Sequence, residues 1–457
     1  MEGTVKIKEL EINNFKNVEK GVLNLQNSGI NTNEFNSIMG IYGQNASSKT
    51  VVIEAFNILK LIASGSTLDS ELLYLLKEEN KNAIFKYTFI IDIRGIKYKV
   101  SYKFEIGYNE ENNKALVYAE KIKYSKYNLE VRSNTKTIID YSVSYDNNNI
   151  IRPNFILNLF NKEEEANSSL VVAKALSKEN SCSFIFNNYS VNTFKKVFGE
   201  TNIYYEILSS IRNFAEYNLV VVSSKYFKKY NNILPIDLGC GKIQLKIFDN
   251  NLISEHSYKI LKHIIDQINI VLETIIPSFR IGIESKSESF IKECELGVKF
   301  ELVSIQGNTK IPLRYESDGT KEIIFIVGLL ISVYNDPKVC LAIDELDSGL
   351  FEFLFGEILV LLKKNGKGQL IFTANNLRAL EVLDKNNFIF TTTNPKNRYI
   401  KLKGVKTTNN LRDFYLRNII LGGQDEKLYN KTYKEYISEA LEKVGIGKFK
   451  LIWFIKE

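Results

Sequence analysis

Two stretches far apart in this chain look like the two halves of one nucleotide site. The first, Gly43 to Thr50, reads Gly-Gln-Asn-Ala-Ser-Ser-Lys-Thr, a pattern typical of loops that bind phosphate groups. The second, Val339 to Glu345, is an apolar run that ends in two carboxylates. A site for a magnesium-bound nucleoside triphosphate needs both parts, so this pairing constrains the fold more than any other feature of the sequence.

The residues on either side of the first stretch support a phosphate loop. Glu34 to Tyr42 predicts a strand, and the residues after Thr50 have helical spacing, so the loop would join a strand to a helix start. Lys49 would neutralise phosphate charge, and the Thr50 hydroxyl would bind Mg²⁺. The candidate nucleotide-binding residues here are Gly43, Gln44, Asn45, Ala46, Ser47, Ser48, Lys49 and Thr50. The alternative is a polar strand-to-helix turn, and Ser48 replaces the second glycine of the usual pattern.

The second stretch predicts a buried strand with catalytic carboxylates at its end. Adjacent carboxylates after a buried strand cost free energy unless a cation or hydrogen bonds compensate them. Asp344 would hold Mg²⁺ directly or through water, and Glu345 would polarise the attacking water. The alternative is a capping pair where the strand ends.

A third segment, Ser317-Asp318-Gly319-Thr320, precedes a strongly apolar helix. Ser317 or Asp318 makes a good N-cap, and Gly319 would let an anion approach the helix end. A simple capping box explains the segment equally well when it is considered alone. Its place shortly before the Asp344-Glu345 pair favours a role in the nucleotide site.

Composition indicates a globular protein of two or three modules. The chain has 457 residues, of which 44% are hydrophobic. Its net charge of +7 permits a nucleic-acid partner but does not imply one. Its four cysteines have no metal-type or disulfide-framework spacing, and no run is apolar enough to span a membrane, so we expect a cytoplasmic protein. Two histidines are too few for chemistry that needs several.

The pattern along the chain predicts an α/β fold that is interrupted. Residues 1–150 combine the phosphate-loop unit with an antiparallel β-subdomain, residues 151–295 form a mainly helical insertion, residues 296–405 return to the α/β unit, and residues 406–457 form a helical tail. Short strands at Phe300–Ile305, Val339–Ile343, Gln369–Thr373 and Asn387–Thr391 predict a parallel sheet. Residues 254–276 predict a helix with a broad apolar face that packs into a core.

Together these motifs resemble the ABC-type ATPases of the SMC, RecF and OLD group. The likeness covers roughly residues 1 to 62 and 300 to 405, and it includes the opening Leu10-Glu11-Ile12-Asn13-Asn14-Phe15-Lys16-Asn17 and the run from Ile343 to Leu350. Within that group the chain is most similar to stand-alone ATP-binding proteins of prokaryotic abortive-infection and antiphage systems. The resemblance implies a phosphate-loop ATPase head with ATP and Mg²⁺ as cofactors.

The resemblance also implies how the site is completed. Ser317, Asp318 and Gly319 would be the signature segment, which contacts the γ-phosphate in the opposite subunit, and Asp347 would cross the interface of a homodimer or a higher assembly. Asn375 stands where the family places a switch histidine. Because an amide carries no proton at neutral pH, Asn375 and Ser48 together indicate slow turnover.

Three functions fit these observations. The first is an ATP-gated sensor or scaffold in antiphage defence that acts with a separately encoded effector, a nuclease or toxin, because the tail after residue 405 is too short for the nuclease domain of OLD proteins. The second is a DNA-binding repair or chromosome-maintenance ATPase like RecF or SMC. The third is a nucleotide-binding scaffold without turnover.

Overall fold

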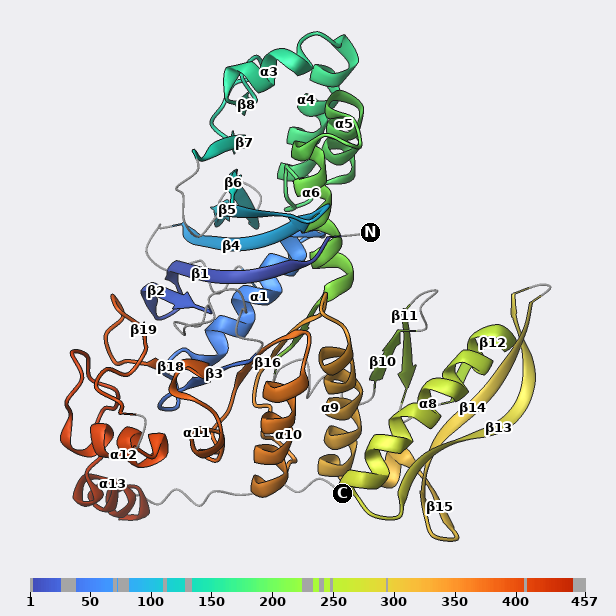
Figure 1. Ribbon diagram of the computed structural model, residues 1–457, viewed down its shortest axis with the longest axis vertical. Coiled ribbons are helices and arrows are strands. Elements are labelled where there is room, and N and C mark those ends of the chain that lie inside the picture. Colours follow the sequence, from blue (N-terminus) through green and yellow to red (C-terminus); the bar gives the residue numbers. More distant parts are fainter. Residues whose placement is uncertain are drawn as a thin grey trace.

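A six-stranded, mainly parallel sheet forms the centre of the computed structural model of this chain (Figure 1). The structure describes residues 3–25, 38–68, 72, 82–109, 113–127, 134–223, 233–237, 242–246, 250–292, 295–406 and 409–446. The strand order is β19-β18-β3-β17-β16-β9, and only the β18–β19 pair is antiparallel. The strands are β3 (Ile38–Tyr42), β9 (Leu219–Val222), β16 (Cys340–Ile343), β17 (Gln369–Thr373), β18 (Phe388–Thr391) and β19 (Tyr399–Ile400).

A seven-stranded antiparallel sheet forms a second layer. Its order is β2-β1-β4-β5-β6-β7-β8. The runs rich in β-branched and aromatic residues after residue 83 form strands of this sheet. The strands are β1 (Val5–Phe15), β2 (Val18–Asn24), β4 (Ala83–Ile93), β5 (Ile96–Asn109), β6 (Lys114–Lys126), β7 (Lys136–Ser142) and β8 (Ile151–Arg152).

Helix α1 (Lys49–Ala63) lies between the two sheets (Figure 1). Its buried apolar residues share one core with strands of the antiparallel sheet and with Met39, Ile41 and Ile371 of the parallel sheet. The Tyr87 hydroxyl of β4 donates to the Ala55 carbonyl of α1 at 2.7 Å. The predicted α/β class, with an antiparallel subdomain beside a parallel core, is confirmed.

Residues 154–218 are mainly helical, before the chain returns to the parallel sheet. The helices are α3 (Asn154–Phe160), α4 (Glu164–Glu179), α5 (Asn188–Phe198) and α6 (Ile203–Asn213), followed by a π-helical turn at Phe214–Asn218. Strand β9 then pairs with β16 at the edge of the core. The predicted helical insertion did not include this strand, because four apolar residues without a turn signal do not distinguish a strand from a helix.

A smaller lobe follows in which one helix covers an antiparallel sheet. Helix α8 (Glu255–Ile275) packs through Leu261, Ile265 and Leu272, so the predicted core-facing stripe is confirmed. Residues Phe300–Ile305 belong to β14 and pair antiparallel with β13, so their predicted place in the parallel sheet is wrong. The strands of this lobe are β10 (Ile233–Asp237), β11 (Lys242–Lys246), β12 (Asn251–Ser254), β13 (Phe279–Lys292), β14 (Glu295–Gln306) and β15 (Thr309–Pro312).

The remaining helices pack around the C-terminal half of the parallel sheet or extend from it (Figure 1). They are α9 (Asp318–Asn335), α10 (Glu352–Asn365), α11 (Ala379–Val382), α12 (Leu411–Leu421) and α13 (Lys434–Ile446). None of the helices in the described ranges is long and apolar enough to cross a membrane. The predicted domain boundaries stay a prediction. Some predicted features lie outside the described residues. They are residues 34–37 of the strand expected before the phosphate loop, residues 447–457 of the tail, Cys240 and Cys294.

Candidate functional site

The phosphate loop, residues 43–50, leaves β3 at the carboxyl edge of the parallel sheet and enters α1. Ligands of open α/β sheets bind at this edge, because loops from neighbouring strands converge there. The Lys49 ammonium donates to the Gly43 carbonyl at 2.7 Å and to Asn375 Oδ1 at 3.0 Å. Burial lowers the pKa of Lys49, against the effect of Asp344, Asp347 and Glu345, which raise it. The phosphate loop and the carboxylates after β16 therefore lie close together.

The loop backbone leaves the start of α1 open to an anion. Ser48 is the N-cap residue, with φ 75°, and its side chain makes no cap hydrogen bond to the helix. Ala46 also has a positive φ, of 62°. The first N–H groups of a helix have no partner within the helix, and an anion there is stabilised by the helix dipole. The arrangement therefore fits a phosphate group.

The two carboxylates after β16 have different surroundings. Asp344 is 6% exposed, and its Oδ1 accepts from the Thr50 hydroxyl at 3.3 Å and from the Thr373 hydroxyl at 2.5 Å. Glu345 is exposed and has a positive φ of 55°. A hydroxyl beside a carboxylate is a ligand set that suits Mg²⁺, which prefers oxygen. Thr50 and Asp344 would therefore hold the ion, and Glu345 is free to face water.

Thr373, at the end of β17, is a site residue that sequence reasoning missed. Its hydroxyl oxygen accepts from the Glu345 backbone N–H at 2.8 Å while its proton goes to Asp344. One buried side chain thus fixes the carboxylate of Asp344 and the backbone of Glu345. The parallel pairing of β16 with β17 brings these residues together, and a hydroxyl at a strand end gave no signal in the sequence.

Asp347 lies against the loop that carries Asn375. Its Oδ2 accepts from the backbone N–H groups of Asn375 at 3.0 Å and Asn376 at 2.8 Å. Among the described residues, none donates a hydrogen bond to its buried Oδ1. Within one chain Asp347 therefore positions Asn375, and its contact across a dimer interface stays a prediction.

The predicted signature segment begins α9. Ser317 is the N-cap, and its hydroxyl oxygen accepts from the Thr320 backbone N–H at 3.1 Å. Asp318 accepts from Lys321 at 3.3 Å, and the nearest atom to a side chain added at Gly319 would be the Cα of Gly349, at 3.9 Å. Among the hydrogen bonds and ion pairs of the described residues, none joins this segment to the phosphate loop. Its predicted place in the site of an opposite subunit stays a prediction.

The outer side of the phosphate loop contacts residues from the far end of the chain. Gln44 accepts from the Asn430 backbone N–H at 2.9 Å and donates to the Asn430 carbonyl at 3.4 Å. The hydroxyls of Ser47 and Thr391 are 2.5 Å apart. Asn45 and Ala46 are exposed. The end of β18 and the segment around Asn430 therefore contact the loop, which the sequence did not indicate.

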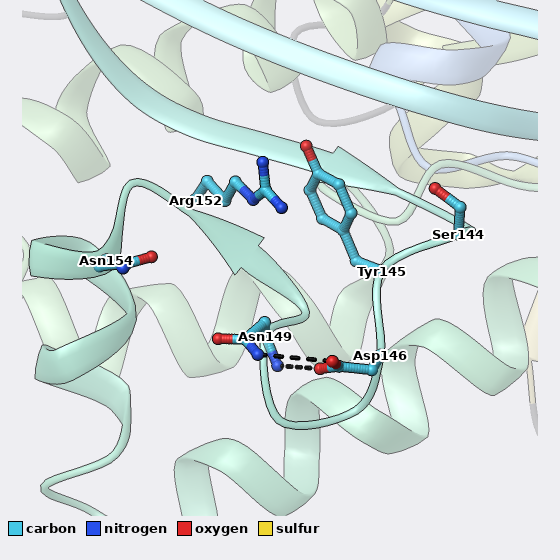
Figure 2. A pocket seen from close by; sticks show the side chains of 6 residues that line it. All are labelled: Ser144, Tyr145, Asp146, Asn149, Arg152 and Asn154. Atoms are coloured by element: carbon cyan, nitrogen blue, oxygen red, sulfur yellow. Dashed lines mark hydrogen bonds between the residues drawn. The ribbon is translucent and has the colours of Figure 1, made fainter.

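Across the described ranges, no cluster of three His, Cys, Asp or Glu side chains could hold a metal ion. A polar cavity is lined by residues between β7 and the start of α3, and there the Arg152 guanidinium lies over the Tyr145 ring, 4.4 Å from its centroid (Figure 2). There Asp146 already accepts from the backbone N–H groups of Asn148 and Asn149.

Comparison with known proteins gives structural neighbours only. No family model and no curated protein matches the chain. An SMC head bound to the C-winged helix domain of ScpA has a TM-score of 0.41 and 13% identity, covering 87% of this chain and 97% of that chain. A Pyrococcus furiosus SMC head with an extended coiled coil, bound to the C-terminal domain of ScpA, has a TM-score of 0.40 and 12% identity. That match covers 87% of this chain and 96% of the Pyrococcus furiosus chain. The Thermotoga maritima SMC head has a TM-score of 0.36 and 12% identity, covering 87% and 99%. Likenesses this distant assign no activity or partner.

Proposed function

We propose that this chain binds ATP with Mg²⁺ and hydrolyses it slowly. The observation that supports this most is the convergence on Lys49, which contacts both the start of its own loop and Asn375, next to the Thr50 and Asp344 pair. A lysine, a hydroxyl, a buried carboxylate and an uncapped helix start are the groups that a triphosphate with its cation requires.

The residues around this site divide the chemistry between them. Lys49 and the N–H groups at the start of α1 would bind the phosphates, and Thr50 and Asp344 would hold Mg²⁺, which supplies charge neutralisation when bound. Glu345 would take the proton of the attacking water. Asn375 can orient water or a phosphate oxygen but cannot hold a proton, which supports slow turnover.

Equilibrium binding and hydrolysis of ATP test this proposal in wild type, Lys49→Ala and Glu345→Gln. We expect tight binding with slow turnover in wild type, binding weakened about 10- to 100-fold in the first variant, and binding without turnover in the second. Glu345→Gln should lengthen the lifetime of the nucleotide-bound state less than the same substitution does in a fast ATPase. Wild-type turnover above about 10 per second, the median for enzymes, would contradict the slow switch.

We also propose that ATP closes two chains into a head-to-tail homodimer. The segments that would face the partner lie together, because the Ser348 hydroxyl donates to Glu322 of α9 at 2.9 Å and the Gly349 backbone approaches the Gly319 carbonyl. Sedimentation with and without ATP tests this proposal, with Glu345→Gln used to hold the closed form. A Glu345→Gln protein that stays monomeric in saturating ATP would contradict it.

The biological role that we propose is an antiphage sensor or scaffold in the cytoplasm, working with a separately encoded effector. The support for it is the sequence resemblance given above. Phage challenge of cells with the chain alone, and with its neighbouring genes, tests the role; protection by the chain alone would contradict a separate effector. A gel shift with duplex DNA at two salt concentrations tests the alternative of a DNA-binding ATPase, for which ATP-dependent, salt-sensitive binding is expected.

A further inference from the structure

The phosphate loop holds two residues in a backbone conformation that favours glycine. Ala46 has φ 62° and Ser48 has φ 75°, and neither has the freedom that glycine gives a loop of this kind. Residues in this region persist where their surroundings determine the conformation. The contacts that the two residues make therefore show what keeps the loop in shape.

One side chain outside the loop contacts both strained residues. Asn17, in the turn between β1 and β2, donates from Nδ2 to the Ala46 carbonyl at 3.0 Å. Its Oδ1 accepts from the Ser48 hydroxyl at 2.6 Å. A single amide thus fixes the carbonyl of one strained residue and the side chain of the other.

A second side chain approaches from the end of the parallel sheet. Tyr399 of β19 is 4% exposed, and its hydroxyl donates to the Ser48 carbonyl at 2.9 Å. Burial raises the pKa of Tyr399, so the hydroxyl keeps its proton for this bond. Gly21 of β2 leaves room for the ring, because a Cβ there would lie 2.5 Å from it.

The two supporting residues are themselves joined. Arg398 donates to the Asn17 carbonyl at 2.6 Å and to the Thr392 carbonyl at 2.6 Å. The backbone N–H groups of Glu19 and Lys20 both donate to the Pro395 carbonyl at 2.9 Å. The β1–β2 turn and the segment before β19 therefore form one unit against the loop.

We propose that Asn17 and Tyr399 are positioning residues that replace the conformational freedom of the missing glycine. Neither needs to touch the nucleotide. They keep the phosphate loop in the conformation that binds nucleotide. The apparent affinity for nucleotide is proportional to the fraction of molecules in that conformation. With glycine at position 48 the conformation depends less on them, because only Ala46 then keeps a positive φ without the freedom of glycine. The effect on affinity rests on the proposed function, whereas the effect on loop shape does not.

A double-mutant cycle tests the proposal through the affinity for a fluorescent ATP analogue. Removing one hydrogen bond by Tyr399→Phe should weaken binding about fivefold in the Ser48 background. In the Ser48→Gly background the same change should weaken binding less than about twofold. Asn17→Ala, at an exposed position, should weaken binding in the Ser48 background and weaken it less in the Ser48→Gly background, where its bond to the Ser48 hydroxyl is already gone. Equal losses in both backgrounds would overturn the proposal, and so would no loss in the Ser48 background.

Tyr87→Phe is the matched control, because it removes a similar bond from a buried tyrosine hydroxyl to a backbone carbonyl of α1, away from the loop. It should lower the melting temperature and leave the affinity unchanged. If Tyr87→Phe weakens binding as Tyr399→Phe does, general destabilisation explains the result and the proposal fails.

Amide hydrogen exchange of residues 43–50 in the nucleotide-free protein separates this inference from the proposed function. Tyr399→Phe should speed exchange in the Ser48 background and not in the Ser48→Gly background. If wild type binds no nucleotide but this pattern holds, the proposed function fails and the positioning role stands. Unchanged exchange in the Ser48 background would overturn the positioning role.

Discussion

Helices α1 and α9 both have a serine as N-cap residue, but only the serine of α9 forms a capping hydrogen bond. Each begins at a serine, yet Ser317 caps its own helix through the Thr320 N–H, whereas Ser48 leaves the first turn of α1 uncapped. The conformation of Ser48 is fixed by Asn17 and Tyr399 instead. A helix start that caps itself is stable by local sequence, and one that is held from outside keeps its N–H groups for a ligand.

The largest expected effect comes from removing the charge at the α1 start. Lys49→Ala deletes the proposed contact to phosphate, which would involve charged groups, so nucleotide affinity should fall about 10- to 100-fold. A titration with a fluorescent nucleotide measures it. Ser317→Ala, at the other helix start, should leave the affinity of the monomer unchanged. Equal losses of nucleotide affinity in both variants would contradict the proposed functional difference between the starts of α1 and α9.

Thr373→Val should have the next largest effect, on stability. The valine leaves the N–H of Glu345 without its acceptor and removes one of the donors to Asp344, at a cost of about 1 to 3 kcal/mol. Urea unfolding measures the loss. Thr373→Ser keeps the hydroxyl and should retain most of the stability and the hydrolysis rate. A serine variant as unstable as the valine variant would show that the methyl group matters more than the bonds.

Ser317→Ala should lower the free energy of unfolding by about 1 kcal/mol, the usual cost of losing an N-cap. The reason is local, since the lost bond lies within the first turn of α9. Urea unfolding at constant protein concentration measures it. An effect near zero would indicate that α9 is held by its packing alone.

The smallest effect is expected from Asp318→Asn. The Asp318 side chain of the ion pair with Lys321 is 77% exposed, so solvent screens the interaction and the loss should stay below about 1 kcal/mol. Thermal unfolding at low and high salt measures it, with the difference between variant and wild type shrinking as salt rises. A larger loss that ignores salt would assign the carboxylate another role.

The sequence predicted the parts of the site that depend on local pattern. The loop from Gly43 to Thr50 shows itself by its flanking strand and helix, and Asp344 follows an apolar run. Thr373, Tyr399 and the Gln44 contact to Asn430 could not be predicted, because each depends on which strands and loops become neighbours. Strand β9 was not predicted, and residues 300–305 of β14 were wrongly assigned to the parallel sheet. The reason is that a short apolar run does not indicate which strand it pairs with.

The strand order also determines when the site can form during synthesis. Strand β3 lies between β17 and β18, whose residues leave the ribosome more than three hundred positions later. The phosphate loop is therefore translated early but has no neighbouring strand until residues 369–391 have emerged. Until then, Met39 and Ile41 of β3 and the buried face of α1 can pack only against the antiparallel sheet and the helices of residues 154–218, with which they share a core.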